Sequence, residues 1–144
     1  MLYYLDTVIV IYAVEGIPAN QQRAVNHLAA LEQAGHRFTI SEFTWTECLV
    51  PVFGPGSGQR LSDFFRFFHG PNLRTVPLTA AMHTRASAIR GRHSYQATPP
   101  AQPKRYGLAD ALHLAAAIES GCNVFLTNDN QVANFPDITV EELP

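Results

Sequence analysis

The sequence has 144 residues, of which 47% are hydrophobic and 10% aromatic, and a formal charge of −2. This length and composition predict one domain, residues 1–144, with a single core, and no apolar run is long enough to cross a bilayer. A secretory signal is not expected, because no basic residue precedes the apolar run Val8 to Val14. We therefore expect a cytoplasmic protein in which Cys48 and Cys122 are free thiols.

In the first half of the chain, hydrophobic periodicity and helix-breaking residues predict two strands and three helices. In order they are a strand over 2–5, a short helix up to residue 14, a helix over 20–33, a strand over 38–40, and a helix that begins after residue 41. Gly35 provides a C-terminal stop for the second helix, and Ser41 is an N-cap candidate for the third.

In the second half, a breaker-rich segment over 51–58 precedes an amphipathic helix with an aromatic stripe, formed by Leu61, Phe64, Phe65 and Phe68. Packing in the core and packing in a subunit interface explain this stripe equally well. Further elements are predicted as a strand over 74–78, a helix capped by Thr79 and ending near residue 91, a helix over 108–119, a strand over 123–127 and a short strand near 138–140. A polar, proline-rich loop over 94–103 is expected to be mobile. Alternating strands and helices favour a mostly parallel sheet between helical layers.

Four acidic residues stand near predicted junctions of strands and helices: Asp6, Glu47, Asp110 and Asp129. Asp6 and Asp129 follow apolar strands, so both are expected at the carboxyl edge of the sheet, where sites form in open α/β folds. Asp110 lies in the first turn of its helix, either as a site residue or as an ordinary charge favoured by the helix dipole. Glu47 is mid-helix, where surface glutamates are common. Since Mg²⁺ and Mn²⁺ prefer oxygen ligands, the set predicts a divalent-metal site.

Other arrangements of reactive residues give weaker signals. His113 lies one helical turn after Asp110 and is either a ligand, an acid-base group or, more in keeping with its helix, a packed side chain. The remaining histidines and the two cysteines lack zinc-ligand spacing. The sequence contains neither a phosphate-binding G-x-x-x-x-G-K-[ST] loop nor a serine nucleophile elbow.

The charges are unevenly distributed along the chain. Residues 65–109 contain no acidic residue and seven of the ten basic ones. This segment is either a surface that faces phosphates or a set of ordinary solvated side chains. A metal site nearby favours nucleic acid, and the candidate phosphate contacts are then Arg85, Arg90, Arg92, Lys104 and Arg105.

Four segments occur in a distinctive order: YLDTVIVIYAVEG, ISEFTWTECL, LADALHLAAAIESG and CNVFLTNDNQVANF. In this order and spacing the chain resembles the PIN-domain family, and most closely the VapC-type ribonuclease toxins of toxin-antitoxin pairs. The resemblance implies a PIN-like three-layer α/β/α sandwich whose mostly parallel central sheet has four to five strands. It also implies that Mg²⁺ or Mn²⁺ binds at the positions of Asp6, Glu47, Asp110 and Asp129.

The same resemblance implies an endonuclease of single-stranded or structured RNA, whose metal activates a water and neutralises charge on the scissile phosphate. We hypothesise that Asp6 and Asp110 hold the essential metal, while Glu47 and Asp129 complete its shell or orient the water. The polar positions beside the acids correspond to Thr7, Thr127 and Asn128. Implied partners are an RNA substrate, a second copy of the chain in a homodimer, and a cognate antitoxin whose C-terminal segment lies across the active-site groove.

One feature departs from the family pattern, because the 94–103 loop is longer than the tight connection usual before the third acidic motif. The positions of Lys104 and Arg105 relative to RNA therefore stay open.

Several other functions remain to be weighed. A PIN-like module that binds RNA or protein without cutting is disfavoured by the complete set of four acids, and a standalone RNA-processing nuclease without antitoxin stays open. A phosphatase of the haloacid dehalogenase type needs a second acid two residues after the first, where this chain has Val8. A nucleotide-binding module needs glycines and N–H donors at positions where this chain has acids.

Overall fold

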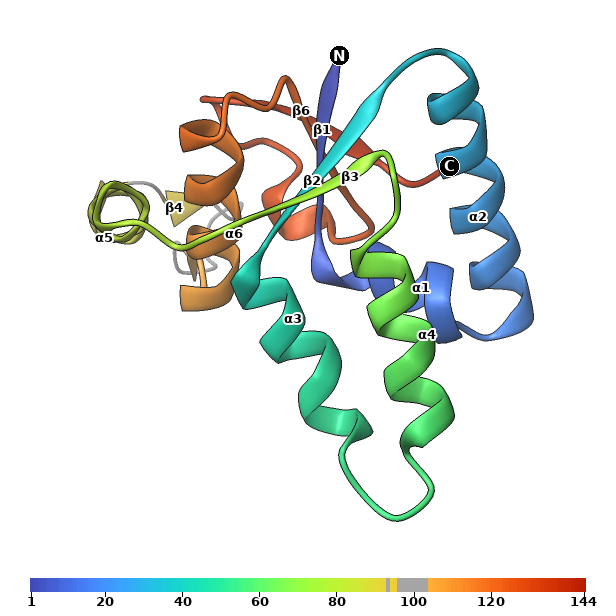
Figure 1. The fold of residues 1–144 in the computed structure, drawn as a ribbon. Coiled ribbons are helices and arrows are strands. Elements are labelled where there is room, and N and C mark those ends of the chain that lie inside the picture. The colour runs from blue at the N-terminus through green and yellow to red at the C-terminus, as the bar shows by residue number, and fades with distance from the viewer. Residues whose placement is uncertain (93, 96–103) are drawn as a thin grey trace.

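The first strand, β1 (Leu2–Leu5), buries side chains on both faces and lies at the centre of the fold (Figure 1). A computed structural model describes residues 1–92, 94–95 and 104–144. Tyr3 and Leu5 belong to one hydrophobic cluster, whereas Tyr4 between them belongs to another. Because successive side chains of a strand point to opposite faces, β1 separates two cores.

The central sheet has five parallel strands in the order β3-β2-β1-β6-β7. The other strands are β2 (Arg37–Ser41), β3 (Leu73–Val76), β6 (Val124–Thr127) and β7 (Thr139–Glu142). Leaving β1, the chain builds one side of the sheet through β2 and β3 and later adds β6 and β7 on the other side. The strand order therefore reverses beside β1, and the carboxyl edge of β1 and β6 is where open α/β sheets form their sites.

Helices cover both faces of the sheet, as Figure 1 shows. They are α1 (Thr7–Glu15), α2 (Pro18–Gln33), α3 (Glu42–Leu49), α4 (Gly58–Phe68), α5 (Ala80–Arg92) and α6 (Leu108–Glu119). Apolar side chains of α1, α2 and α4 fill the first cluster, while α5 and α6 supply most of the second. The predicted three-layer α/β/α sandwich and its parallel sheet are thus confirmed.

The element bounds agree with the sequence predictions to within a few residues. The third strand begins and ends slightly earlier than predicted, and the last strand, β7, extends further toward the C-terminus. Thr79 caps α5, since its hydroxyl accepts from the Met82 amide at 3.3 Å. Positive φ angles of 83° at Gly35 and 74° at Gly121 follow the ends of α2 and α6, as expected for glycine at helix stops.

Three details differ from the predictions or add to them. Ser41 occupies the N-cap position of α3 but makes no side-chain cap bond, because its hydroxyl pairs instead with that of Tyr4 at 2.9 Å. A short antiparallel pair, β4 (Ser94–Tyr95) and β5 (Lys104–Arg105), flanks the predicted loop. The loop's residues 96–103, and with them its predicted mobility, lie outside the described residues. The short 3₁₀ helices are η1 (Val50–Val52) and η2 (Asn130–Val132).

Both cysteines are free, as predicted. Cys48 is buried, and burial raises the pKa of its thiol to about 12, so this thiol is unreactive at neutral pH. Among the described residues, none of the helices combines the length and the apolar character needed to cross a bilayer.

The aromatic stripe of α4 divides between core and surface. Phe64 and Phe68 are buried, and Phe68 stacks on Trp45 of α3 with ring centroids 4.7 Å apart. Phe65 remains 40% exposed. The core therefore accounts for two of the three phenylalanines, and Phe65 is left partly at the surface.

Candidate active site

Asp6 joins the central strand to the first helix, as the residue after β1 and the N-cap of α1. Its amide donates to the Leu126 carbonyl at 3.0 Å and so extends the pairing of β1 with β6. Both oxygens of its carboxylate accept hydrogen bonds, Oδ1 from the Thr7 amide at 2.8 Å and Oδ2 from the Thr127 hydroxyl at 2.6 Å. The carboxylate is thus held in one orientation at the carboxyl edge of the sheet.

Thr127 connects the ends of the two neighbouring strands. Its hydroxyl donates to Asp6 and accepts from the Asp129 amide at 3.0 Å. Asp129 is the N-cap of η2, where its Oδ1 accepts from the Gln131 amide at 2.8 Å. Asn128 lies between them, with its amide nitrogen 3.5 Å from the Tyr12 hydroxyl. The Thr127 hydroxyl therefore links the two strand-end aspartates to each other.

Asp110 stands in the first turn of α6, as predicted, and is close enough to the strand-end aspartates to sense their charge. Burial raises the pKa of its carboxyl, and the charges of Asp6 and Asp129 raise it further. Burial likewise raises the pKa of Asp6, to which the charge of Glu47 adds. Carboxylates that repel one another in a partly buried site are stabilised by a bound cation.

Glu47 reaches the same region from α3. Its Oε2 accepts from the Thr7 hydroxyl and from His113 Nε2, each at 2.5 Å. Burial acts to raise the pKa of Glu47, but the hydrogen bonds from His113 and Thr7 outweigh it and the net shift is downward. Glu47 is therefore held ionised within the protein.

His113 has more polar contacts than its sequence position suggested. The ring is 2% exposed, and its Nδ1 lies 2.8 Å from the Tyr4 hydroxyl while Nε2 faces Glu47. The sequence interpretation favoured a packed helix residue, and the ring is indeed buried. The signal that could have revealed its polar role is the Asp110-x-x-His113 spacing, which places both side chains on one face of α6.

The donor types in this region suit a hard divalent cation, because all four acidic groups supply oxygen. Within the part of the chain that the structure describes, no three His, Cys, Asp or Glu side chains already form a coordination cluster. The hydrogen bonds explain this in part, since Glu47 is turned toward Thr7 and His113. Each carboxylate oxygen has two lone pairs, so oxygens bonded to one donor, such as those of Asp6, retain capacity for a cation.

The predicted phosphate contacts are dispersed. Arg85 forms a salt bridge with Glu119 at 2.5 Å, at the end of α6 opposite Asp110. Arg90 donates to the Tyr106 carbonyl at 3.2 Å, near the start of α6, and Arg92 is exposed at the end of α5. The side chains of Lys104 and Arg105 lie outside the described part of the structure.

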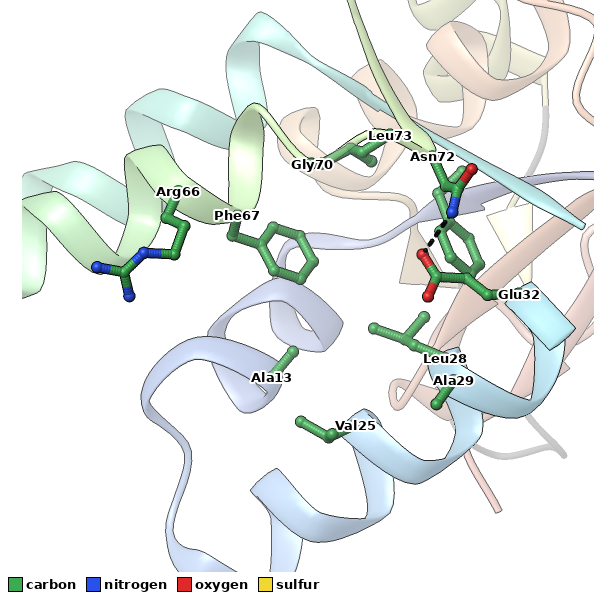
Figure 2. A pocket seen from close by; sticks show the side chains of 11 residues that line it. Ala13, Val25, Leu28, Ala29, Glu32, Arg66, Phe67, Gly70, Asn72 and Leu73 are labelled. Carbon is green, nitrogen blue, oxygen red and sulfur yellow. Dashed lines mark hydrogen bonds between the residues drawn. The ribbon is translucent and has the colours of Figure 1, made fainter.

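A separate groove of about 280 Å³ lies between α1, α2 and α4, as Figure 2 shows. Its walls are mostly apolar and include Leu28, Phe67 and Leu73, with Glu32 and Arg66 among the charged lining residues. None of the candidate site residues lines this groove.

Comparison with known proteins identifies the fold. The family model for the PIN domain matches residues 3–138. A VapBC2 structure from Rickettsia felis, bound to a promoter DNA fragment, aligns with a TM-score of 0.75 at 20% identity over 100% of both chains. A DNA-bound VapBC structure from Salmonella typhimurium gives 0.72 at 20% identity, also over 100% of both chains. VapC20 of Mycobacterium tuberculosis, a toxin that cleaves the sarcin-ricin loop, gives 0.67 at 14% identity over 94% of this chain and 98% of that one. No protein of curated function matches the sequence.

Proposed function

The chain belongs to the PIN-domain family, and on that premise we propose that it is a metal-dependent endoribonuclease and the toxin of a type II toxin-antitoxin pair. The observation that carries the proposal is that the aspartates gather at the carboxyl edge of β1 and β6, where the Thr127 hydroxyl donates to Asp6 and accepts from the Asp129 amide. Asp110, in the first turn of α6, belongs to the same region: burial raises the pKa of its carboxyl, and the charges of Asp6 and Asp129 raise it further. A fold that gathers partly buried carboxylates at a sheet edge is built to bind a cation.

Asp6, Glu47, Asp110 and Asp129 would hold Mg²⁺ or Mn²⁺, with Asp6 and Asp110 essential and the other two completing the shell or orienting water. When bound, such a cation supplies Lewis-acid activation of water and charge neutralisation at a phosphodiester. Thr7 and Thr127 position these acids through hydrogen bonds to Glu47 and Asp6. Asn128, whose amide lies near the Tyr12 hydroxyl, stays a candidate for positioning water on sequence grounds. Thr127 keeps the Asp6 carboxylate in a fixed rotation through its 2.6 Å hydrogen bond, so the oxygen donors are oriented before any ligand binds.

The proposed substrate is RNA, with Arg90 and Arg92 as the better supported phosphate contacts. Arg90 lies near the start of α6, where Asp110 also lies, and Arg92 is exposed on the same helix as Arg90. Arg85 is a weaker candidate, because Glu119 already neutralises it. Lys104 and Arg105 stay in the proposal on sequence grounds, since they follow the loop that precedes the third acidic motif.

The proposed protein partners are a cognate antitoxin and a second copy of the chain. Two of the similar structures are VapBC assemblies, and a third, from Klebsiella pneumoniae, is a toxin-antitoxin complex. The mostly apolar groove of Figure 2 and the exposed side chains of Phe53 and Phe65 support protein partners, because exposed apolar patches mark interaction surfaces.

Controlled expression in a bacterial host tests this proposal. Induction of the wild-type chain should arrest growth and produce new RNA 5′ ends at a small number of positions, whereas Asp6→Asn should do neither. Asp63→Asn on α4 is the matched control, because that aspartate lies at the surface in a pair with Arg66 and should leave both effects unchanged. Arrest by Asp6→Asn equal to that of the wild type would contradict the proposal.

A further inference from the structure

A chain of buried polar groups runs from the sheet to Glu47. The hydroxyl of Tyr4 is hydrogen-bonded to Ser41 Oγ at 2.9 Å and to His113 Nδ1 at 2.8 Å. Tyr4 is fully buried, Ser41 is buried, and His113 is 2% exposed. Buried polar side chains are costly unless their partners are in place, so a connected set of this kind fixes the positions of its members.

This series of hydrogen-bonded groups ends at a single oxygen of Glu47. Oε2 accepts from His113 Nε2 and from Thr7 Oγ1, each at 2.5 Å, and these two donor atoms are themselves 3.1 Å apart. Oε1 accepts no hydrogen bond from the residues whose side chains are described. One carboxylate oxygen is thus held by two donors, and the other is left for a ligand.

The contacts also fix the position of the imidazole. Because Nε2 faces a carboxylate oxygen, it carries a hydrogen and donates to Glu47. On the other side of the ring, Nδ1 lies 2.8 Å from the oxygen of the Tyr4 hydroxyl, which donates to Ser41 Oγ. The ring is further confined by Phe43, whose centroid lies 5.2 Å away, and by the Tyr4 ring at 5.8 Å.

We propose that His113, which is hydrogen-bonded to Tyr4 through Nδ1, is a positioning residue for Glu47. It holds the carboxylate so that Oε2 accepts its hydrogen bond and Oε1 stays free for the cation. The inference rests on the proposed metal-dependent function. His113 acts through Glu47 and touches neither the cation nor RNA. Since Asp110 and His113 stand three residues apart on α6, one helix both supplies a ligand and orients a second ligand from α3.

Groups that hydrogen-bond to metal ligands typically change metal affinity about 10- to 100-fold when removed. His113→Leu should therefore weaken Mn²⁺ binding about 10- to 100-fold. His113→Gln, which keeps an N–H donor at a similar reach, should recover most of that loss. Tyr4→Phe should weaken Mn²⁺ binding by a smaller factor, because the His113 imidazole keeps its contact with Glu47 and loses only the Tyr4 hydroxyl, which fixes its orientation.

The test is titration of the purified full chain with Mn²⁺, following free Mn²⁺ by electron paramagnetic resonance. His27→Leu is the matched control, because His27 also pairs with a glutamate, Glu141, at 2.9 Å. Both residues of that pair lie outside the candidate site. It should bind Mn²⁺ like the wild type. In a Glu47→Gln background, His113→Leu should cause no further loss, since its effect passes through that carboxylate.

Each outcome is decisive. Wild-type affinity in His113→Leu, or a full additional loss in the Glu47→Gln background, would overturn the positioning role while leaving the nuclease proposal intact. If His113→Leu fails to fold, the Tyr4→Phe variant decides in its place, and equal Mn²⁺ affinity of wild type and Tyr4→Phe would overturn the role. A wild-type chain that binds no Mn²⁺ would overturn both the role and the proposed metal site.

Discussion

Replacing Tyr4 with phenylalanine tests whether the buried polar chain is intact in solution. The substitution keeps the ring, which stacks on Phe125 with centroids 5.5 Å apart, and removes only the hydroxyl. His113 Nδ1 and Ser41 Oγ then lose their partner in a buried environment. Each buried polar group left without a partner costs about 1–3 kcal/mol. The Ser41 hydroxyl can rotate toward another partner, which lowers its share, so we expect the free energy of unfolding to fall by about 2–4 kcal/mol.

Urea unfolding and thermal scans measure this loss. At roughly 3 °C per kcal/mol for a chain of this size, Tm should fall by about 6–12 °C. Tyr3→Phe is the matched control on the same strand, because its hydroxyl donates to the partly exposed Glu141 at 3.3 Å and water replaces that bond. The control should lose less than about 1 kcal/mol. Equal losses in the two variants would refute the reasoning.

Three further predictions concern charge, metal and core. In metal-free buffer, Asp110→Asn should stabilise the protein relative to wild type, by an amount that grows as pH rises above the ordinary carboxyl pKa near 4. The reason is that the Asp110 carboxyl has a higher pKa in the folded than in the unfolded protein. Its contribution to the stability of the wild type is therefore present below the unfolded-state pKa and is lost as pH rises through the folded-state pKa. Unfolding titrations from acid to neutral pH check this, and a difference that shrinks with pH would show the sign to be wrong. Mn²⁺ at about 100 times its Kd should stabilise the wild type by about 2.7 kcal/mol in a thermal-shift assay and leave Asp6→Asn unchanged; an equal shift in both would place the ion elsewhere. Phe64→Ala, which removes a fully buried ring, should cost about 3–5 kcal/mol in urea unfolding, whereas Phe65→Ala, at a 40% exposed position, should cost about 1 kcal/mol or less; similar losses would mean that α4 packs differently.

The sheet edge was predictable because its signals are local. Asp6 and Asp129 each follow a short apolar run, and a strand that ends on a polar residue at a helix start is visible without knowledge of its neighbours. The parallel sheet followed from the alternation of strands and helices. Asp110 was placed correctly in a first turn for the same local reason.

The contacts that orient the site were not predictable, because they join residues distant in sequence. Thr7 and Glu47 are 40 positions apart, and Tyr4 and His113 are 109 apart. A tyrosine in an apolar strand is predicted to be a core residue. Its neighbours in the sequence do not indicate that its hydroxyl is hydrogen-bonded to a histidine. For the same reason Ser41 was interpreted as a side-chain cap, although Tyr4 competes for its hydroxyl.

The most direct test of the central claim is cleavage of total RNA by purified, antitoxin-free protein in Mg²⁺, Mn²⁺ or EDTA, beside Asp6→Asn prepared identically. The account predicts discrete fragments with either cation, none in EDTA, and none from the variant. Intact RNA in every lane, with the protein shown to be folded, would contradict it, as would equal cleavage by Asp6→Asn.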